Sequence, residues 1–122
     1  MTGPVKKKLP GMFGLGIDLV EVVRIRRLSA RRAFLQRCFT TGELAYSLGK
    51  NKYERLAARF AVKEAVIKAL DARHLALKDI EVENTASGSP RVRIKKILQT
   101  GLTVSISHTA SYAVAAVIVF KK

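Results

Sequence analysis

The spacing of apolar residues changes near residue 72, and this change limits what the chain can fold into more than any other feature of its sequence. Before that point, residues 52–72 repeat apolar positions at helical spacing, and alanines between them raise the helix propensity. After it, apolar residues alternate with polar ones, as in strands. Helical segments followed by strands predict an α+β domain, with a long central helix packed on an antiparallel sheet. The apolar positions of that helix are Leu56, Phe60, Ile67 and Leu70.

Local signals place the other elements. Residues 12–20 form an apolar run punctuated by Gly14 and Gly16, which predicts a strand. Residues 21–39 carry apolar residues at helical spacing with arginines between them, and residues 40–43 have the form of a capping box that begins another helix. Further strands are predicted at 80–82 and 91–94 around a polar loop, and at 103–107 and 112–120 as a hairpin.

The ends of the chain and its cysteine content indicate a soluble, cytoplasmic protein. Residues 1–11 form a basic arm before a single domain, 12–122, and this length is typical of one domain. Three lysines precede an apolar stretch, but Pro10 and Gly11 interrupt it and no small-residue cleavage site follows, so a signal peptide is not expected. The longest apolar run, 112–120, is far shorter than the ~20 residues of a membrane span. The single cysteine, Cys38, cannot form an intrachain disulfide and is expected to be a small packed hydrophobe.

The net charge points to anionic partners. Twenty-three Lys and Arg against nine Asp and Glu give +14. Such a field attracts nucleic acid, anionic lipid, phosphorylated cofactors or an acidic protein, and composition does not choose among them.

The sequence lacks complete versions of two familiar motifs, for dinucleotide and for zinc binding. Gly14 and Gly16 resemble the start of a dinucleotide fingerprint, but Leu19 stands where the third glycine would be. One cysteine and two histidines provide no zinc cluster.

Two carboxylates stand out instead. Asp18 closes an otherwise apolar strand, where a carboxylate needs polar partners or water, or where it serves as the N-cap of the following helix. Glu64 lies within the long helix with Lys68 four residues on, so the two share a helix face. A surface ion pair is the simplest interpretation of that spacing.

Taken together, several segments of the chain resemble the holo-(acyl-carrier-protein) synthase family of phosphopantetheinyl transferases. Residues 14–21, GLGIDLVE, resemble its N-terminal signature, and residues 59–65, RFAVKEA, followed by KAL at 68–70, resemble its central helix motif. Residues 79–82 with 87–90 and residues 105–109 with 112–115 are similar to its later strands and loops. The segments occur in the family's order from residue 14 to about residue 119, nearly the whole chain.

The resemblance implies a reaction and a metal. Members of the family transfer 4′-phosphopantetheine from coenzyme A to a serine of apo acyl carrier protein and release adenosine 3′,5′-bisphosphate, in support of fatty acid biosynthesis. A pyrophosphate suits a hard cation with oxygen ligands, and Mg²⁺ takes only one or two protein carboxylates. By resemblance, Asp18 and Glu64 hold Mg²⁺, and Lys68 balances negative charge on the leaving group. Either Glu64 or a metal-bound water removes the serine proton.

The resemblance also implies binding residues for coenzyme A. Arg59 and His108 are expected at its nucleotide end, with Gly88 and Pro90 shaping the adenine pocket. Lys68 and Thr109 complete the expected set.

An acidic carrier protein would match the positive charge. By resemblance the first helix docks the carrier, through Arg24, Arg27, Arg31 and Arg32. The family is commonly trimeric with sites at subunit boundaries, and residues 112–120, apolar on both strand faces, suit burial on both sides. One departure is the loop after Leu70, residues 71–75, which lacks the family's glycines.

Two alternatives remain open. A small basic nucleic-acid-binding protein would explain the charge directly but not Asp18 or the face shared by Glu64 and Lys68. A related transferase domain serving a synthase complex would share the same motifs. We expect neither nucleic acid nor a membrane as a partner.

Overall fold

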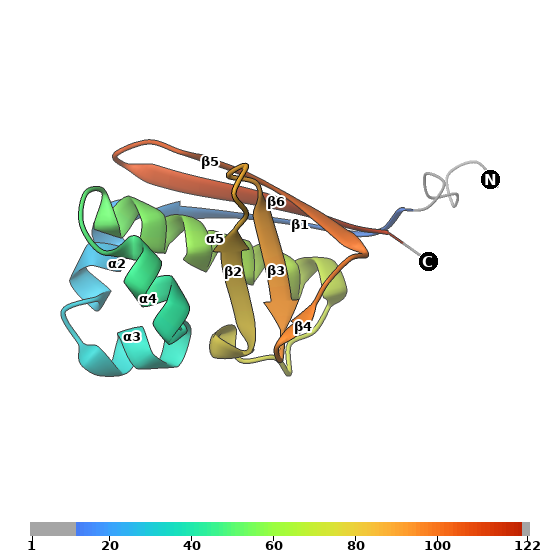
Figure 1. Ribbon diagram of the computed structural model, residues 1–122, viewed down its shortest axis with the longest axis horizontal. Coiled ribbons are helices and arrows are strands. Elements are labelled where there is room, and N and C mark those ends of the chain that lie inside the picture. Colours follow the sequence, from blue (N-terminus) through green and yellow to red (C-terminus); the bar gives the residue numbers. More distant parts are fainter. Residues whose placement is uncertain (1–11, 121–122) are drawn as a thin grey trace, which may run out of the picture.

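The computed structural model describes residues 12–120, so the basic arm expected at 1–11 lies outside the described residues. Figure 1 shows a helical layer at one end of the molecule, a long central helix and two small sheets. The elements, in chain order, are β1 (Met12–Glu21), α2 (Val22–Leu28), α3 (Arg32–Cys38), α4 (Thr41–Ser47), α5 (Lys52–Leu70), a 3₁₀ turn η1 (Leu77–Asp79), β2 (Ile80–Asn84), β3 (Pro90–Ile94), β4 (Ile97–Leu98), β5 (Leu102–His108) and β6 (Tyr112–Phe120).

The α+β prediction is confirmed, although the strands form two sheets rather than one. The first sheet has the order β1-β6-β5 and the second β2-β3-β4, and all neighbouring strands are antiparallel. Helix α5 packs against β1 and β6 of the first sheet and also contacts β2 of the second. The predicted hairpin of β5 and β6 is present, joined through residues 109–111.

Two glycines bring the central helix unusually close to β1. A Cβ atom on Gly16 would lie 1.9 Å from the backbone oxygen of Ala65, and one on Gly14 would lie 2.1 Å from that of Ala69. No side chain can occupy that space, so the two glycines and the facing alanines form a backbone-to-backbone contact. The two glycines that resemble a dinucleotide motif in the sequence therefore allow α5 to pack closely against β1.

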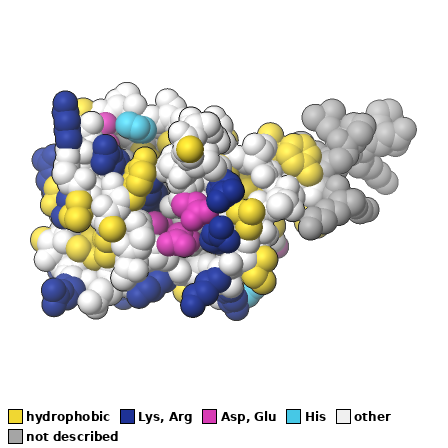
Figure 2. Space-filling model, in the orientation of Figure 1, with side chains coloured by type: hydrophobic (Ala, Val, Ile, Leu, Met, Phe, Trp, Pro, Cys, Tyr) yellow, Lys and Arg dark blue, Asp and Glu magenta, His cyan; other side chains and the backbone are white. Residues whose placement is uncertain are grey.

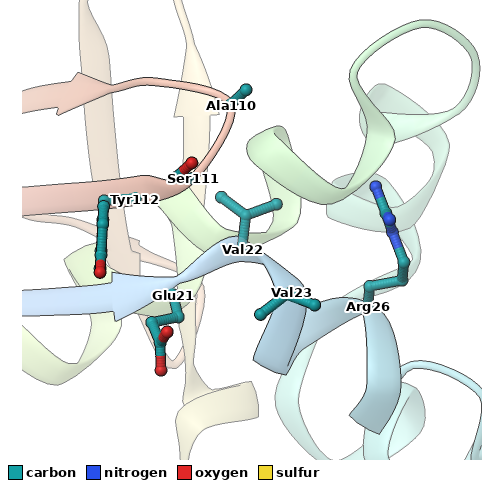
Figure 3. A pocket seen from close by; sticks show the side chains of 7 residues that line it. All are labelled: Glu21, Val22, Val23, Arg26, Ala110, Ser111 and Tyr112. Atoms are coloured by element: carbon teal, nitrogen blue, oxygen red, sulfur yellow. The ribbon is translucent and has the colours of Figure 1, made fainter.

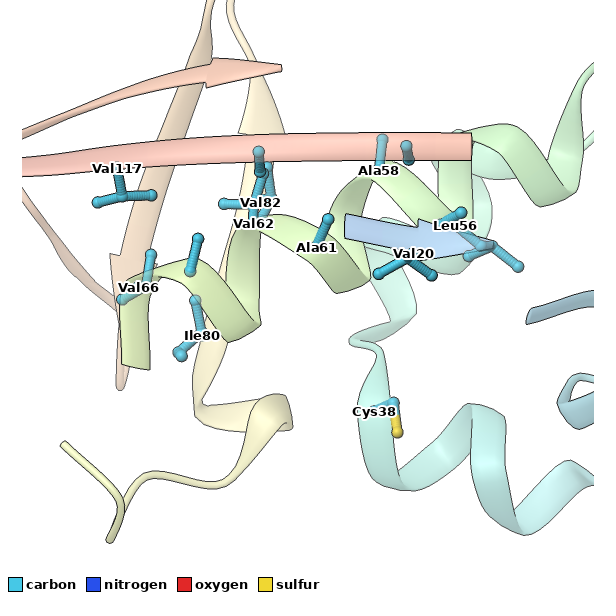
Figure 4. Packing of buried hydrophobic residues seen from close by; sticks show 14 of the residues in the cluster. Val20, Cys38, Leu56, Ala58, Ala61, Val62, Val66, Ile80, Val82 and Val117 are labelled. Atoms are coloured by element: carbon cyan, nitrogen blue, oxygen red, sulfur yellow. The ribbon is translucent and has the colours of Figure 1, made fainter. Parts of the chain in front are cut away.

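Helix α5 is buried on most of its circumference. Its fully buried residues include Leu56, Ala61, Val62 and Val66, and Figure 4 shows them packed with Val20, Ile80, Val82 and Val117 of the strands. Of the four apolar positions predicted to face the core, only Leu56 is fully buried, and the other three are partly covered. The small alanines and valines fill the closer contacts because a sheet or a short helix presses on each side of α5.

The segment predicted as one helical stretch, 21–39, is two short helices. The chain turns at residues 29–31 between α2 and α3. From Leu28 to Phe34 the apolar positions are six apart, a step that does not return to the same helix face, so the two stretches cannot share one buried stripe. Cys38 is buried at the end of α3, as expected, and burial raises the pKa of its thiol.

A buried ion pair joins the short helices to α5. The predicted capping box is present, since Thr40 Oγ1 accepts from the Glu43 amide and Glu43 Oε1 accepts from the Thr40 amide. Glu43 also pairs with Lys63 of α5 at 2.5 Å, and both side chains are fully buried. Nothing in the sequence analysis identified this pair.

The first sheet has one covered and one open face. Strand β6 was expected to be covered on both faces, but only alternate residues, from Ala113 to Val119, are buried in the single chain. On β1 the outward residues that alternate with the inward positions 14, 16 and 18 are large and apolar, and Leu15, Ile17 and Leu19 are 57–65% exposed. The open face is therefore an apolar surface on an otherwise strongly basic protein.

Candidate functional site

Asp18 lies within β1 rather than at its end. It is paired with Ala115 of β6, and three more residues of the strand follow it. Glu21, not Asp18, is the N-cap of α2, and it makes no side-chain cap bond, so the N-cap interpretation of Asp18 is wrong. Strand alternation puts Asp18 on the same side of β1 as Gly14 and Gly16, the side that meets α5.

Lys68 of α5 reaches Asp18. Its Nζ donates to Asp18 Oδ1 at 3.2 Å and to the backbone oxygen of Ile17 at 3.0 Å. The surface ion pair considered from the four-residue spacing, between Glu64 and Lys68, is not formed, because the ammonium bonds to the strand instead. The Lys68 side chain is 55% exposed, whereas that of Asp18 is 16% exposed.

Glu64 belongs to the same group of charges. Burial raises the pKa of its carboxyl, and the nearby Asp18 charge raises the pKa further, while Lys68 and Arg24 act in the opposite direction. This coupling shows that Asp18, Glu64 and Lys68 form one electrostatic cluster, to which α2 adds Arg24. Because the charge of Asp18 disfavours the ionised form of Glu64, a cation beside both carboxylates would be favourable.

The donor set suits a hard divalent cation. Among residues 12–120 no three or more His, Cys, Asp and Glu side chains gather into a metal-binding group. Two carboxylates without nitrogen or sulfur ligands are a poor site for zinc but match Mg²⁺, which usually completes its coordination with phosphate oxygens and water. Asp18 and Glu64 are the residues that could hold it.

A second region collects most of the residues expected to bind coenzyme A. A cavity of about 400 Å³ lies between α4, α5, the second sheet and β5 of the first sheet, and Arg59, Gly88, Pro90 and His108 all line it. Its remaining lining residues are Tyr46, Asn51, Arg55, Ala58, Val82, Asn84 and Ile106. The cavity therefore combines an aromatic ring, two arginines and apolar surface.

Arg59 is held rigidly in this cavity. Its guanidinium donates to Asn84 Oδ1 at 2.7 Å and to the Arg55 backbone oxygen at 3.2 Å, and lies 4.2 Å from the centre of the Tyr46 ring. Its Nε is buried and has no hydrogen-bond partner among the described residues. Burial lowers the pKa of Arg59, yet a guanidinium remains a cation, so the site presents a fixed positive charge.

His108 and Thr109 have different surroundings. His108 Nδ1 lies 3.1 Å from Glu54 Oε1, at the cavity wall. Thr109 does not line the cavity, and its hydroxyl accepts from the backbone amides of Ser111 and Tyr112 in the turn between β5 and β6. In this chain the observed role of Thr109 is to hold the turn.

Another cavity, of about 290 Å³, contains none of the expected metal or coenzyme A residues. It lies where β1 passes into α2, beside the turn between β5 and β6. Figure 3 shows Arg26 and Glu21 at its edges with Val22 and Val23 between them.

The four arginines expected to dock a carrier are all exposed, but they do not lie on one helix. Arg24 and Arg27 lie on α2, whereas Arg31 precedes α3 and Arg32 begins it. Only Arg24 acts on Glu64. Figure 2 shows Lys and Arg side chains spread over one face of the molecule, with Asp and Glu gathered near its centre. On the second sheet, Glu83 pairs with Arg91 and Arg93.

Comparison with known proteins identifies the family. The model of the 4′-phosphopantetheinyl transferase superfamily matches residues 14–117. The chain belongs to this superfamily. The holo-(acyl-carrier-protein) synthase of Thermodesulfovibrio yellowstonii is 48% identical to this phosphopantetheinyl transferase over 114 residues, covering 87% of this chain and 96% of that protein. The synthase of Bacillus subtilis is 39% identical, covering 88% and 95%.

Solved structures agree with this assignment. The holo-(acyl-carrier-protein) synthase of Bacillus anthracis in complex with CoA (3′,5′-ADP) superposes with a TM-score of 0.79 at 32% identity, covering 92% of this chain and 99% of that one. The Helicobacter pylori synthase in complex with coenzyme A gives 0.73 at 31% identity, with 88% and 99% covered. The resemblance of the sequence to this family is confirmed.

Several residues that line the Arg59 cavity or contact its wall were not identified from the sequence. Tyr46, Arg55 and Asn84 line the cavity with Arg59, and Glu54 contacts His108. Arg55 offered a signal, since it lies one helical turn before Arg59. Tyr46 and Asn84 offered none, because only the tertiary fold brings α4 and the end of β2 to α5.

Within residues 12–120 no helix is long and apolar enough to cross a membrane.

Proposed function

We propose that this phosphopantetheinyl transferase moves 4′-phosphopantetheine from coenzyme A to a serine of an apo acyl carrier protein, in support of fatty acid biosynthesis. The serine oxygen forms a bond to the pantetheine-side phosphorus, and the bond from that phosphorus to the bridging oxygen breaks, which releases adenosine 3′,5′-bisphosphate. The observation that carries the proposal is the meeting of Asp18 from β1 with Glu64 and Lys68 from α5 in one charged cluster.

Asp18 and Glu64 would hold Mg²⁺. When bound, the cation neutralises pyrophosphate charge and orients the reacting phosphorus. Lys68 has a half-exposed ammonium beside Asp18, from where it can pair with phosphate oxygens and stabilise the negative charge of the leaving group. Either Glu64 or a water bound to the cation would accept the serine proton.

The cavity around Arg59 would hold the nucleotide end of coenzyme A. A fixed guanidinium stacked on Tyr46 suits a phosphate and a neighbouring purine, and apolar side chains from Val82 and Ile106 complete the wall. The open backbone at Gly88, where φ is +88° and an added Cβ would meet nothing within 4 Å, leaves room for a ring to approach. Lys68 would contact the pyrophosphate, and Thr109 would act through the turn that it supports.

The exposed arginines would dock the carrier. Arg24 lies beside the proposed metal site, and Arg27, Arg31 and Arg32 extend the positive surface along α2 and the start of α3. An acidic carrier approaching this surface is steered towards Glu64.

The open face of the first sheet supports self-association. We place a second and third copy of the chain on the apolar stripe of β1 and the half-exposed face of β6, as a homotrimer with sites at the subunit boundaries. A single strand with Leu15, Ile17 and Leu19 exposed side by side is a surface that proteins normally cover. Light scattering in solution measures the assembly directly. A buried free thiol also suits a cytoplasmic location.

One experiment tests the reaction. The protein is incubated with coenzyme A, Mg²⁺ and an apo carrier, and the carrier is weighed by mass spectrometry. We expect the mass to increase by one phosphopantetheine and the increase to vanish with chelator. An unchanged carrier, together with tight, salt-resistant binding of nucleic acid by the same preparation, would contradict the proposal and favour the nucleic-acid-binding alternative.

A further inference from the structure

We infer that the buried ion pair of Lys63 and Glu43 is a positioning device, which fixes the rotation of α5 so that Glu64 faces Asp18. The inference rests on the proposed function, because it concerns the geometry of the metal pair. Lys63 and Glu43 make no hydrogen bond or ion pair with Asp18 or Glu64; both side chains are buried, and Glu43 also belongs to the capping box of α4.

Lys63 uses every proton of its ammonium in bonds to other elements. Its Nζ donates to Glu43 Oε1 at 2.5 Å, to the Cys38 backbone oxygen at 2.7 Å and to the Leu77 backbone oxygen at 3.1 Å. The side chain is fully buried, and its Nζ lies 5.3 Å from the centre of the Phe39 ring. One side chain of α5 is thereby tied to the end of α3, to α4 and to η1.

Both carboxylate oxygens of Glu43 also accept hydrogen bonds. Its Oε1 accepts from the Thr40 amide at 2.9 Å as well as from Lys63, and its Oε2 accepts from the Val82 amide of β2 at 2.8 Å. The carboxylate thus bridges the capping box of α4, the central helix and the second sheet. A change in the direction of the Lys63 side chain would break its bonds to the end of α3, to α4 and to η1 at once.

Lys63 directly precedes Glu64 in helix α5, so the network that holds Lys63 also orients Glu64. Successive residues of an α-helix point about 100° apart, so the direction of Lys63 sets that of its neighbour Glu64. On the other side of the helix, the glycines of β1 set how close α5 comes to the strand, but a contact of bare backbone offers no side chain to resist rotation or sliding. The ion pair adds directional bonds to the packing that holds α5 in place.

A contribution to stability does not by itself explain the buried ion pair of Lys63 and Glu43. Replacing a buried ion pair by apolar residues of similar size is often neutral or stabilising, because desolvation opposes the attraction of the charges. The directional bonds of the pair, unlike apolar packing, specify one arrangement of the helix.

The test replaces both partners by apolar residues of similar shape, Lys63→Met with Glu43→Leu. We expect a lowered Tm, because the amides of Thr40 and Val82 and the carbonyls of Cys38 and Leu77 lose their hydrogen-bond partners. Assayed below that Tm, the double variant should show kcat lowered about 10–100-fold, a higher Mg²⁺ concentration for half-maximal activity, and a KM for coenzyme A within about threefold, because a misplacement of ~1 Å can cost 10² in rate. Val92→Ala, a truncation in the core of the second sheet, is the matched control and should lower Tm while kcat is kept.

Each outcome has one meaning. A double variant that folds and matches the wild type in kcat and Mg²⁺ dependence overturns the inference, as does a defect confined to KM. If the double variant does not fold, Glu43→Gln is assayed below its Tm: lowered kcat with raised Mg²⁺ demand supports the positioning role, and unchanged kcat overturns it. If the wild type itself transfers no phosphopantetheine, the proposed function fails instead.

Discussion

Replacing Gly16 by alanine tests the contact that places α5 on β1. The added Cβ would lie 1.9 Å from the Ala65 oxygen, 2.8 Å from the Ala69 nitrogen and 2.9 Å from the Ala65 carbonyl carbon. All three are backbone atoms, so no side chain can rotate away. Ordinary contact begins at 3.4 Å, which means that the helix must move from the strand by about 1.5 Å.

That movement should affect both stability and activity. Overpacking of a core costs about 1–3 kcal/mol, and here backbone atoms must shift, so we expect a loss of at least ~3 kcal/mol. For a domain of this size the Tm should fall by roughly 10 °C or more. Since Asp18 lies on β1 and Glu64 on α5, the same shift separates the metal ligands, and a misplacement of ~1 Å can cost 10² in rate.

Thermal unfolding followed by circular dichroism and the carrier mass assay measure the two effects. Gly42→Ala is the matched control, because its Cβ would meet side-chain atoms and no backbone, the nearest being Glu81 Oε2 at 2.9 Å, and alanine favours helix α4. The close-packing argument is refuted if Gly16→Ala unfolds at the wild-type temperature and transfers phosphopantetheine at the wild-type rate.

Three further predictions concern the charges. Asp18→Ala and Glu64→Ala should each keep the fold and lower transfer by at least ~10²–10³-fold, as chelator does, and a variant with near-wild-type transfer in Mg²⁺ would remove its residue from the metal site. Lys68→Ala should lower kcat more than it raises the KM for coenzyme A, whereas unchanged kcat with raised KM in steady-state kinetics would make Lys68 a binding residue only. Arg24→Glu with Arg31→Glu should weaken carrier docking, leave coenzyme A binding measured by calorimetry intact, and show a smaller defect at high salt; a salt-independent defect would speak against docking by charge.

Local signals in the sequence predicted most elements of the fold. The strand at the N-terminus, the capping box before α4, the long helix and the final hairpin are confirmed because each depends on residues close in the chain. The break between α2 and α3 was missed, although the six-residue step from Leu28 to Phe34 could have revealed it. The end of α5 was placed two residues late, since Asp71 takes the left-handed conformation that glycine usually supplies.

The candidate site was only partly accessible from sequence. Asp18, Glu64 and Lys68 were singled out, but the partner of Lys68 was not, because strand β1 is distant in sequence and only packing brings it to α5. The buried pair of Glu43 and Lys63 was not identified for the same reason: charged residues are usually exposed, and only the tertiary fold buries these two. Burial of a charge depends on tertiary structure, which no local pattern encodes.

The even-numbered and odd-numbered positions of strand β1 have different roles. The even-numbered positions 14, 16, 18 and 20 face the helix and include Asp18, whereas the odd positions 15, 17 and 19 carry the exposed apolar surface. Because neighbouring side chains point to opposite faces, the two sets can be altered independently. Polar residues at the odd positions would make the chain easier to keep in solution as a single copy without touching the helix contact. An insertion or deletion of one residue within the strand would exchange the two sets and disable both together.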